Sequence, residues 1–131
     1  MMTRIIRIGA RRQYRVVVDA ADYAYLARWR WTFQRSAWRY GARIYARRSV
    51  RRGGRTVTLY MHAVILGERM RLRRPSRAHS CDHLDTDSLD NTRDNLAWAT
   101  AREQRANQRR RITAAEIVAH EVARAGCEAR R

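Results

Sequence analysis

The chain has 131 residues and a formal net charge of +17 at pH 7, and its length favours one domain or one small domain with an appendage. All 29 basic side chains are arginine, and the resulting pI of about 11.6 indicates a polyanionic partner: nucleic acid is the first candidate and an anionic membrane surface a weaker one. A solvated basic surface is the alternative. Because we find no apolar run near the ~20 residues that span a bilayer and no signal peptide, we expect a cytoplasmic protein.

The first residues predict a β-hairpin. Residues 4–8 (RIIRI) and 13–18 (QYRVVV) are short, rich in β-branched side chains and partly alternating, as strands with one buried face are. Residues 9–12 (GARR) are expected to form the turn between them.

A short helix and a third strand should follow. Asp19 is expected to cap a helix over residues 20–27, because its side chain can accept a hydrogen bond from the first turn. Trp29, Trp31 and Phe33 then alternate, which predicts a strand with one buried aromatic face.

A clearer hairpin has arms at residues 40–50 and 55–60 and a turn at 51–54, where two glycines supply the positive φ that tight turns need. The two-residue period of the first arm separates an arginine and tyrosine face from an apolar one. The first face suits phosphate contact and stacking, and a solvated edge strand is the equal alternative. Its residues are Arg43, Tyr45 and Arg47.

The next segment predicts a short apolar helix over residues 59–66 that ends at Gly67. His62 within it is interpreted as a packed core residue, with a ligand role as the alternative. Residues 68–80 then form a basic connector that could hold a phosphate backbone. The connector arginines predicted to bind nucleic acid are Arg71, Arg73, Arg74 and Arg77.

An acidic window interrupts this basic chain at residues 81–91 (CDHLDTDSLDN). The local pattern predicts a strand at 80–84, a polar loop, a returning strand at 96–99, and a helix at 101–108 capped by Thr100. This order of strand, loop, strand and helix is expected to place the end of the first strand against one face of the helix.

Three further residues of the window, Asp85, Asp87 and Asp90, do not fit a calcium loop, because neither possible frame has the required glycine and glutamate. We interpret them as turn-forming residues. Cys81 is interpreted as a buried thiol; it and Cys127 form no CxxC pair, which argues against a cysteine-rich zinc site.

Asp82 and His83 are the two residues of this arrangement that could bind a metal ion and transfer a proton. One carboxylate and one amide oxygen from the facing helix can hold Mg²⁺ when substrate phosphate and water complete the shell. The adjacent imidazole can deprotonate water near pH 7. Together these are the parts of a phosphodiester hydrolase that uses one metal ion.

The same residues resemble the HNH endonuclease family, in its phage and intron-associated branch. The resemblance covers about 30 residues: Asp82-His83, then Leu89-Asp90-Asn91, then Asn95 to Thr100 (NLAWAT), then Gln104 and Asn107. It implies a ββα-metal fold, DNA as the partner, and one divalent cation, Mg²⁺ or Mn²⁺, as the cofactor.

The resemblance also implies a role for each matching residue. His83 matches the general base, Asp82 the first metal ligand, and Asn95 the residue that holds the loop and helps to orient the base. Gln104 falls where the family has its last ligand, Asn or His, and Asn107 could assist or substitute one turn along the helix. Arg105 on the same helix is expected to contact nucleic acid.

The predicted fold is therefore α+β, with four regions. An N-terminal β-rich, DNA-contacting part (1–67) contains a small antiparallel sheet and short helices. The basic connector (68–80) and the ββα-metal motif (81–111) follow. A C-terminal helical tail (112–131) opens with a capping box at Thr113.

The leading functional hypothesis is a metal-dependent HNH endonuclease acting on DNA. Gln104 in place of the expected ligand motivates the alternative, an HNH-like protein that binds nucleic acid and cuts weakly or not at all. A basic RNA-binding or ribosome-associated protein is a third hypothesis, which accounts for the arginine content but not for the spacing from Asp82 to Asn107.

Overall fold

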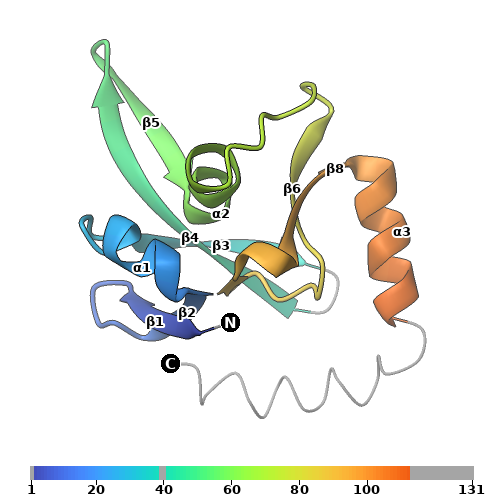
Figure 1. Ribbon diagram of the computed structural model, residues 1–131, viewed down its shortest axis with the longest axis horizontal. Coiled ribbons are helices and arrows are strands. Elements are labelled where there is room, and N and C mark those ends of the chain that lie inside the picture. The colour runs from blue at the N-terminus through green and yellow to red at the C-terminus, as the bar shows by residue number, and fades with distance from the viewer. Residues whose placement is uncertain (1, 39–40, 113–131) are drawn as a thin grey trace.

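The computed structural model describes residues 2–38 and 41–112, which form an α+β fold of three small sheets and three α-helices (Figure 1). The predicted α+β class is confirmed. One continuous core joins the sheets and helices, and it is built from side chains distant in sequence, among them Ile8, Leu26, Ala46, Ile65 and Leu96.

The first sheet begins with the predicted hairpin. β1 (Thr3–Ile8) and β2 (Tyr14–Asp19) pair antiparallel, in a register that sets Ile6 opposite Val16. Both side chains are buried, because alternate residues of each strand face the core. Helix α1 (Ala20–Leu26) follows directly and ends one residue earlier than predicted.

Asp19 stands at the N-cap of α1, as predicted, but its side chain makes no capping hydrogen bond. Its carboxylate instead accepts a hydrogen bond from the backbone N–H of Arg93 at 3.1 Å. The predicted side-chain cap was wrong because a donor 74 residues further along the chain competes for the same oxygen.

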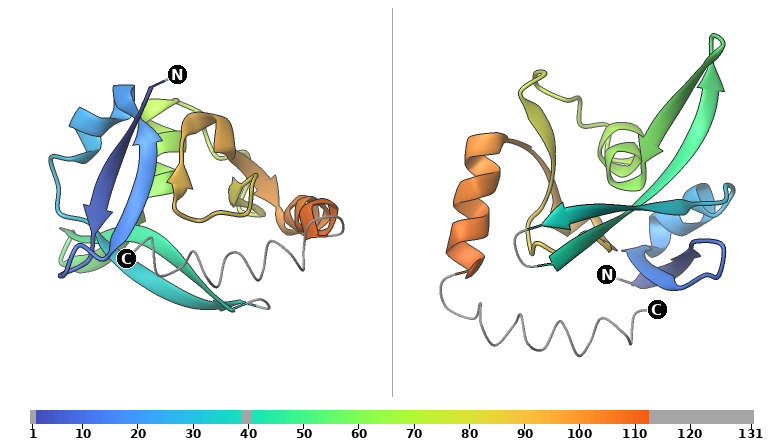
Figure 2. Two further views of the ribbon diagram at one scale, coloured as in Figure 1. Left: turned by 90° about the horizontal axis from the view of Figure 1, so that it is seen from below. Right: turned by 180° about the vertical axis from the view of Figure 1, so that it is seen from behind.

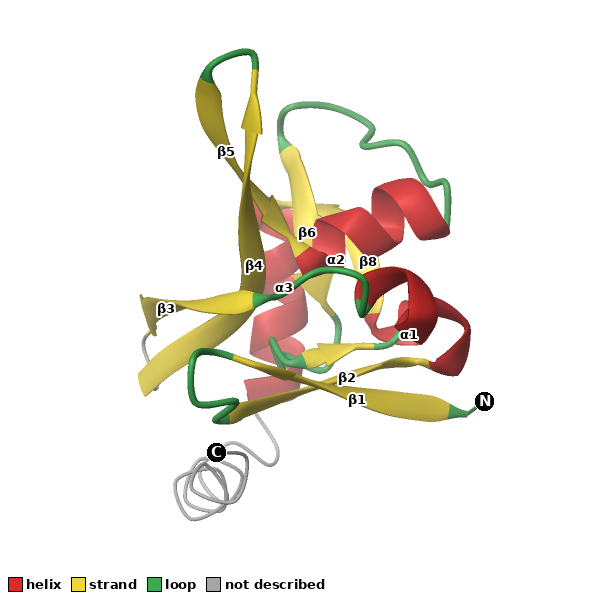
Figure 3. Cartoon of the chain, turned by 90° about the vertical axis from the view of Figure 1, so that its left-hand side faces the viewer, coloured by secondary structure: helices red, strands yellow, loops and turns green. Residues whose placement is uncertain are grey.

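The second sheet has its longest strand in the middle. β3 (Thr32–Trp38) pairs with the first half of β4 (Gly41–Arg52), and β5 (Arg55–Tyr60) pairs with the second half. Arg47 marks the change, since it lies opposite Thr32 on one side and Tyr60 on the other. The β4–β5 hairpin therefore projects from the body of the molecule (Figure 3).

The hairpin turn is shorter than the predicted 51–54, because β4 continues to Arg52 and pairs with β5 there. The role predicted for the two glycines is confirmed, since Gly53 and Gly54 adopt φ values of 56° and 77°. The predicted aromatic strand starts later than expected, at Thr32. Trp31 lies before it, buried, with its indole N–H donating to Leu26 O at 2.8 Å. This bond holds the tryptophan against the end of α1 rather than in the sheet.

The predicted apolar helix is shorter at its start and continues past its predicted end. α2 (Met61–Val64) runs into a π-helical turn, Ile65–Arg69, which includes Gly67. The left-handed residue that follows is Arg71, with φ 57°. Gly67 was therefore wrong as the stop signal, because Met70 N–H still finds Ile65 O at 2.8 Å.

The last described part has the predicted ββα order (Figure 2). β6 (His79–His83) and β8 (Leu96–Thr100) pair antiparallel, and α3 (Ala101–Ile112) follows them. Thr100 and Glu103 form a capping box: Thr100 Oγ1 accepts Glu103 N–H at 3.2 Å, and Glu103 Oε1 accepts Thr100 N–H at 2.9 Å. The cap predicted for Thr100 is confirmed.

Two connections join this ββα unit to the N-terminal sheet. β7 (Asp90–Asn91), in the loop between β6 and β8, pairs parallel with Val17 and Val18 of β2. Asp22 of α1 is fully buried and binds Arg69 at 3.0 Å and Arg93 at 2.6 Å. A single carboxylate thus ties α1 to the π-helical turn and to the 3-10 turn Arg93–Asn95.

The predicted C-terminal capping box and helix lie outside the described residues. Within residues 2–38 and 41–112, no helix combines the length and apolar character needed to cross a membrane.

Candidate active site

Asp82 and His83 lie at the end of β6, where the strand enters the loop. They pair with Ala97 and Leu96 of β8, and both are nearly buried, with exposed fractions of 7% and 6%. Adjacent strand residues point to opposite faces. Asp82 accordingly meets α3, while His83 meets the second sheet and the start of α2.

A hydrogen bond fixes the protonation pattern of the His83 ring. Its Nε2 lies 2.8 Å from Oδ1 of Asn91, a fully buried residue of β7. Because the carboxamide oxygen can only accept, Nε2 carries the proton and Nδ1 keeps its lone pair. Burial lowers the pKa of His83 below its ordinary value, although the Asn91 bond and nearby Asp87 oppose the shift. The ring is therefore neutral at pH 7 and has a basic nitrogen.

A group of rings surrounds His83. His62 contacts it edge to face at 5.0 Å between centroids, and Tyr45 lies 6.1 Å away. Tyr60 stacks on His62 at 5.3 Å and donates its hydroxyl proton to Gln34 at 2.8 Å. Burial, with a contribution from His83, lowers the pKa of His62 to about 3. His62 thus adds no positive charge beside His83 at neutral pH.

Asp82 meets Asn107 on α3. Asn107 Nδ2 lies 3.4 Å from Asp82 Oδ2 and donates to Leu84 O at 3.0 Å. Gln104 lies one helical turn earlier and does not bond Asp82. Its Nε2 donates to Ser80 Oγ at 2.6 Å and to Ala99 O at 3.0 Å. The structure therefore brings Asp82 together with Asn107, and it places the Gln104 amide at the start of β6 and the end of β8.

The donors around Asp82 fit a hard divalent cation. A carboxylate and a carboxamide face each other across β6 and α3, and a half-turn of the carboxamide of Asn107 exchanges its nitrogen for its oxygen. Magnesium needs one or two such protein ligands when substrate phosphate and water supply the others. Nowhere in the described part of the chain do three His, Cys, Asp or Glu side chains form a metal cluster, so only a sparse site of this kind is available there.

Asn95 holds the loop between β6 and β8. Its Oδ1 accepts Asp85 N–H at 2.8 Å, and its Nδ2 donates to Asp90 O at 2.7 Å. The predicted loop-holding contact is thus present, but the direct bond to the His83 ring comes from Asn91.

The loop carboxylates form turns, which confirms their predicted interpretation. Asp85 accepts the N–H of Asp87 at 2.8 Å, Asp87 that of Leu89 at 3.0 Å, and Asp90 that of Thr92 at 3.2 Å. Burial and a hydrogen bond with Asp90 raise the pKa of Asp85 to about 6.

Cys81 was predicted to be a buried thiol and is half-buried in the structure. It packs against the core beside Asp82, and desolvation raises its pKa to about 12. The thiol stays protonated at physiological pH and is a poor nucleophile.

The residues predicted to bind nucleic acid fall in two places. Arg43, Tyr45 and Arg47 share the face of β4 that meets His83, which we call the site face; Arg43 acts electrostatically on His83. The others are exposed on the connector or on α3. They are Arg71, Arg73, Arg74, Arg77 and Arg105.

Arg74 has an additional structural role in the connector. Its guanidinium donates to His79 O at 2.5 Å and to Arg77 O at 2.8 Å, which folds the segment leading into β6.

Sequence reasoning missed two parts of this site. Asn91 had been interpreted only as a turn residue, although the Leu-Asp-Asn triplet was recognised as part of the motif. His62 had been interpreted as a core residue, and nothing local indicates that it contacts a ring 21 positions later. The available signal for a role of His62 in the site was an isolated histidine, two residues after Tyr60, in an apolar segment.

No family model matches this sequence, and no curated protein matches it. Among solved structures, the chain is similar to one titled "DNA binding and cleavage by the HNH homing endonuclease I-HmuI", with a TM-score of 0.43 and 21% sequence identity. The likeness covers 85% of this chain and 60% of that chain, so this chain spans less than two thirds of that protein.

Proposed function

We propose that this chain is a divalent-metal-dependent endonuclease of the HNH type that hydrolyses DNA phosphodiester bonds. One observation carries the proposal: the ββα unit places a nearly buried carboxylate, Asp82, against the Asn107 carboxamide, and sets beside it a neutral imidazole with a basic nitrogen. This combination supplies a cation site and a general base within a strongly basic chain.

His83 is the proposed general base. Its Nδ1 accepts the proton of the attacking water, while Asn91 holds Nε2–H and stabilises the imidazolium that forms. The surrounding rings of Tyr45 and His62 limit the movement of the imidazole. Because both histidines have lowered pKa values, the base is in its reactive form at neutral pH.

Asp82 and Asn107 are the proposed cation ligands, with Gln104 as a support for the turn between β8 and α3. A divalent cation bound there supplies positive charge that stabilises the phosphate and the leaving oxygen in the transition state. Asn95 keeps the loop closed, and so keeps the end of β6 at a fixed distance from α3.

Substrate binding is assigned to arginines around this centre. Arg43 and Arg47 lie on the site face, and Arg43, which acts electrostatically on His83, is the one assigned to the phosphate under attack. The β4–β5 hairpin and the connector into β6 both project from the body of the molecule (Figure 3), and both are rich in arginine. Their exposed guanidinium groups should bind the DNA backbone without sequence preference.

The test is cleavage of supercoiled plasmid with Mg²⁺ or Mn²⁺. His83→Ala should lower the cleavage rate by about 10²–10⁴-fold, which is the usual contribution of a general base. His79→Ala is the matched control, because His79 lies in the same strand and bonds Ser76 rather than the site. A wild-type protein that never cuts, or an His83→Ala variant that cuts equally well, would refute the proposal.

The alternative, a protein that binds nucleic acid without cutting it, is distinguished by Gln104→Asn. If the Gln104 position must supply a metal ligand, this change should create cleavage in an inert parent. We expect no gain, because the amide of Gln104 is directed toward Ser80 and Ala99 rather than toward Asp82.

A further inference from the structure

The face of β4 opposite the site face carries a stack of arginine and aromatic side chains. The guanidinium carbons of Arg28 and Arg48 lie 4.3 Å and 4.2 Å from the centroid of the Trp29 ring. The series continues from Arg28 to Tyr25 at 4.2 Å and from Arg48 to Trp31 at 5.7 Å. We call Arg28, Trp29 and Arg48 the arginine–tryptophan stack.

Neither arginine of the stack makes an ion pair within the described residues, whereas Arg69, which also contacts Tyr25, is paired with Asp22 at 3.0 Å. The nearest carboxylate of the series is Glu68, which accepts a hydrogen bond from the Tyr25 hydroxyl. Arg28 is exposed and is oriented by a bond from its Nε to Tyr25 O at 3.0 Å. Arg48 Nε is buried and has no hydrogen-bond partner among the described residues.

Two guanidinium groups on one ring repel each other, so this arrangement is unfavourable unless a further interaction stabilises it. A cation–π contact at an exposed site contributes only about 0.5–1 kcal/mol. Arg28 Nε is already bonded to Tyr25 O and Arg48 Nε is buried, so a phosphate would be met by the terminal N–H groups of the two side chains. A guanidinium group can bind phosphate through two parallel hydrogen bonds.

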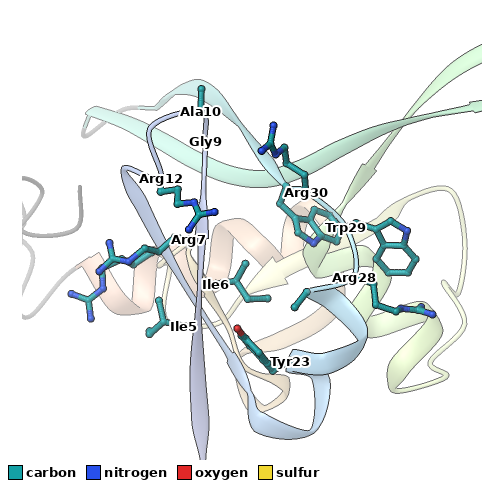
Figure 4. A pocket seen from close by; sticks show the side chains of 13 residues that line it. Ile5, Ile6, Arg7, Gly9, Ala10, Arg12, Tyr23, Arg28, Trp29 and Arg30 are labelled. Carbon is teal, nitrogen blue, oxygen red and sulfur yellow. The ribbon is translucent and has the colours of Figure 1, made fainter.

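A hollow of about 600 Å³ lies beside the stack and extends the same basic surface (Figure 4). It lies between β1 and the segment 27–31, and both Arg28 and Trp29 line it. No acidic side chain lines the hollow. Its arginines are Arg7, Arg12, Arg15, Arg28 and Arg30.

We propose that the arginine–tryptophan stack and this hollow bind the phosphodiester backbone of nucleic acid at a second place, separate from the candidate active site. Arg48 and Tyr45 are three residues apart on one strand, so they point to opposite faces of β4. DNA bound over His83 can therefore contact the stack only if it passes around the edge of the second sheet. A chain of phosphates suits several guanidinium groups held side by side better than a single anion does.

The proposal rests on nucleic acid as the proposed partner, but not on cleavage. Binding of labelled duplex DNA by the whole chain can be measured by fluorescence anisotropy in EDTA, across a range of salt concentrations. Because EDTA removes divalent cations, this assay measures binding without cleavage. A failure of the catalytic proposal and a failure of this one would therefore appear in different measurements.

The decisive variant is Arg28→Gln/Arg48→Gln. Each phosphate contact contributes about 0.9 to the slope of log affinity against log salt, so this variant should flatten the slope by about 2 and bind more weakly. Arg11→Gln/Arg102→Gln is the charge-matched control, at two exposed positions outside the stack and the hollow. Equal slopes in the two double variants would overturn the proposal.

A second variant separates charge from packing. Arg28→Lys/Arg48→Lys keeps both positive charges and should keep a slope close to that of the wild type. A slope as flat as that of the glutamine variant would overturn the phosphate role, since packing on Trp29 would then be what was lost. Unchanged DNA binding in the glutamine variant would also overturn it.

Discussion

The two faces of β4 both carry aromatic rings, but the rings pack against different kinds of side chain. On the site face, Tyr45 packs with His62 around the buried His83. On the other face, Trp29 lies between Arg28 and Arg48. Both faces combine rings with nitrogen-containing side chains, but the site face buries His83, whereas on the other face Arg28 is exposed and Arg48 is half-buried.

The difference follows from the pKa of each base. Imidazole can lose its proton when it is buried, and burial lowers the pKa of both His62 and His83. Guanidinium cannot be deprotonated in a protein, so it needs water or an anion along its edges. The enclosed face is therefore suited to proton transfer, and the open face to binding a polyanion.

Cleavage and DNA binding should therefore depend on different residues. Changes at the candidate active site should lower the cleavage rate and leave DNA affinity in EDTA largely intact. Changes at the arginine–tryptophan stack should lower DNA affinity and leave the cleavage step largely intact.

Asn107→Ala should reduce metal-dependent cleavage by more than about 100-fold. Residues that only support a metal ligand contribute roughly 10–100-fold, and a ligand should contribute more. Gln104→Ala should have a much smaller effect, because its amide bonds Ser80 and Ala99. Single-turnover cleavage over a range of Mg²⁺ concentrations measures both. If Gln104→Ala is the more damaging change, the ligand assignment must be reversed.

Asn91→Leu should lower the cleavage rate by about 10–100-fold, since it removes the bond that orients the His83 ring. Asn91→Asp keeps an acceptor oxygen and should retain more activity than the leucine variant. The loss should appear in kcat rather than in KM, because Asn91 is buried and does not contact DNA. An equal loss in both variants would indicate a purely structural role.

Asp22→Asn should destabilise the fold by roughly 3 kcal/mol at pH 7, because two arginines lose their buried carboxylate partner. Burial alone would raise the pKa of Asp22, but hydrogen bonds from Arg93 and Arg69 hold it below its ordinary value of 3.8. A lowered pKa stabilises the folded state above that value, and the stabilisation is lost as the pH falls through the folded-state pKa.

Urea unfolding of the wild type and of Asp22→Asn measures this effect. The difference in free energy of unfolding should be constant from pH 7 to about pH 5 and should shrink as the pH falls below 3.8. A difference that does not change with pH would mean that the carboxylate charge contributes little.

Local patterns predicted much of this molecule. The glycine pair at the β4–β5 turn, the Thr100 cap and the strand ending in Asp82 and His83 all depend on neighbouring residues, and each is present. The boundary at Gly67 was missed because a π-helical turn carries the chain past it. A local stop signal is outweighed when the next residues, here up to Met70, still find helical partners.

Contacts between distant segments could not be predicted in this way. The parallel pairing of β7 with β2 sets Asn91 beside His83, and the packing of α2 on β4 brings in His62. Gln104 and Asn107 lie one turn apart on the same side of α3, and both meet β6, Gln104 at Ser80 and Asn107 at Asp82. The resemblance assigns the last ligand to Gln104, but which of the two meets Asp82 depends on how far along α3 the end of β6 lies, and tertiary packing sets that position.

The most direct test of the central claim is chemical rescue of His83→Ala. This variant should be nearly inactive on duplex DNA with Mg²⁺, and added imidazole should restore part of its cleavage by occupying the space that the side chain leaves. Asn107→Ala, measured in parallel, should not respond to imidazole. An His83→Ala variant that cuts at the wild-type rate without imidazole would contradict the assignment of His83 as the base.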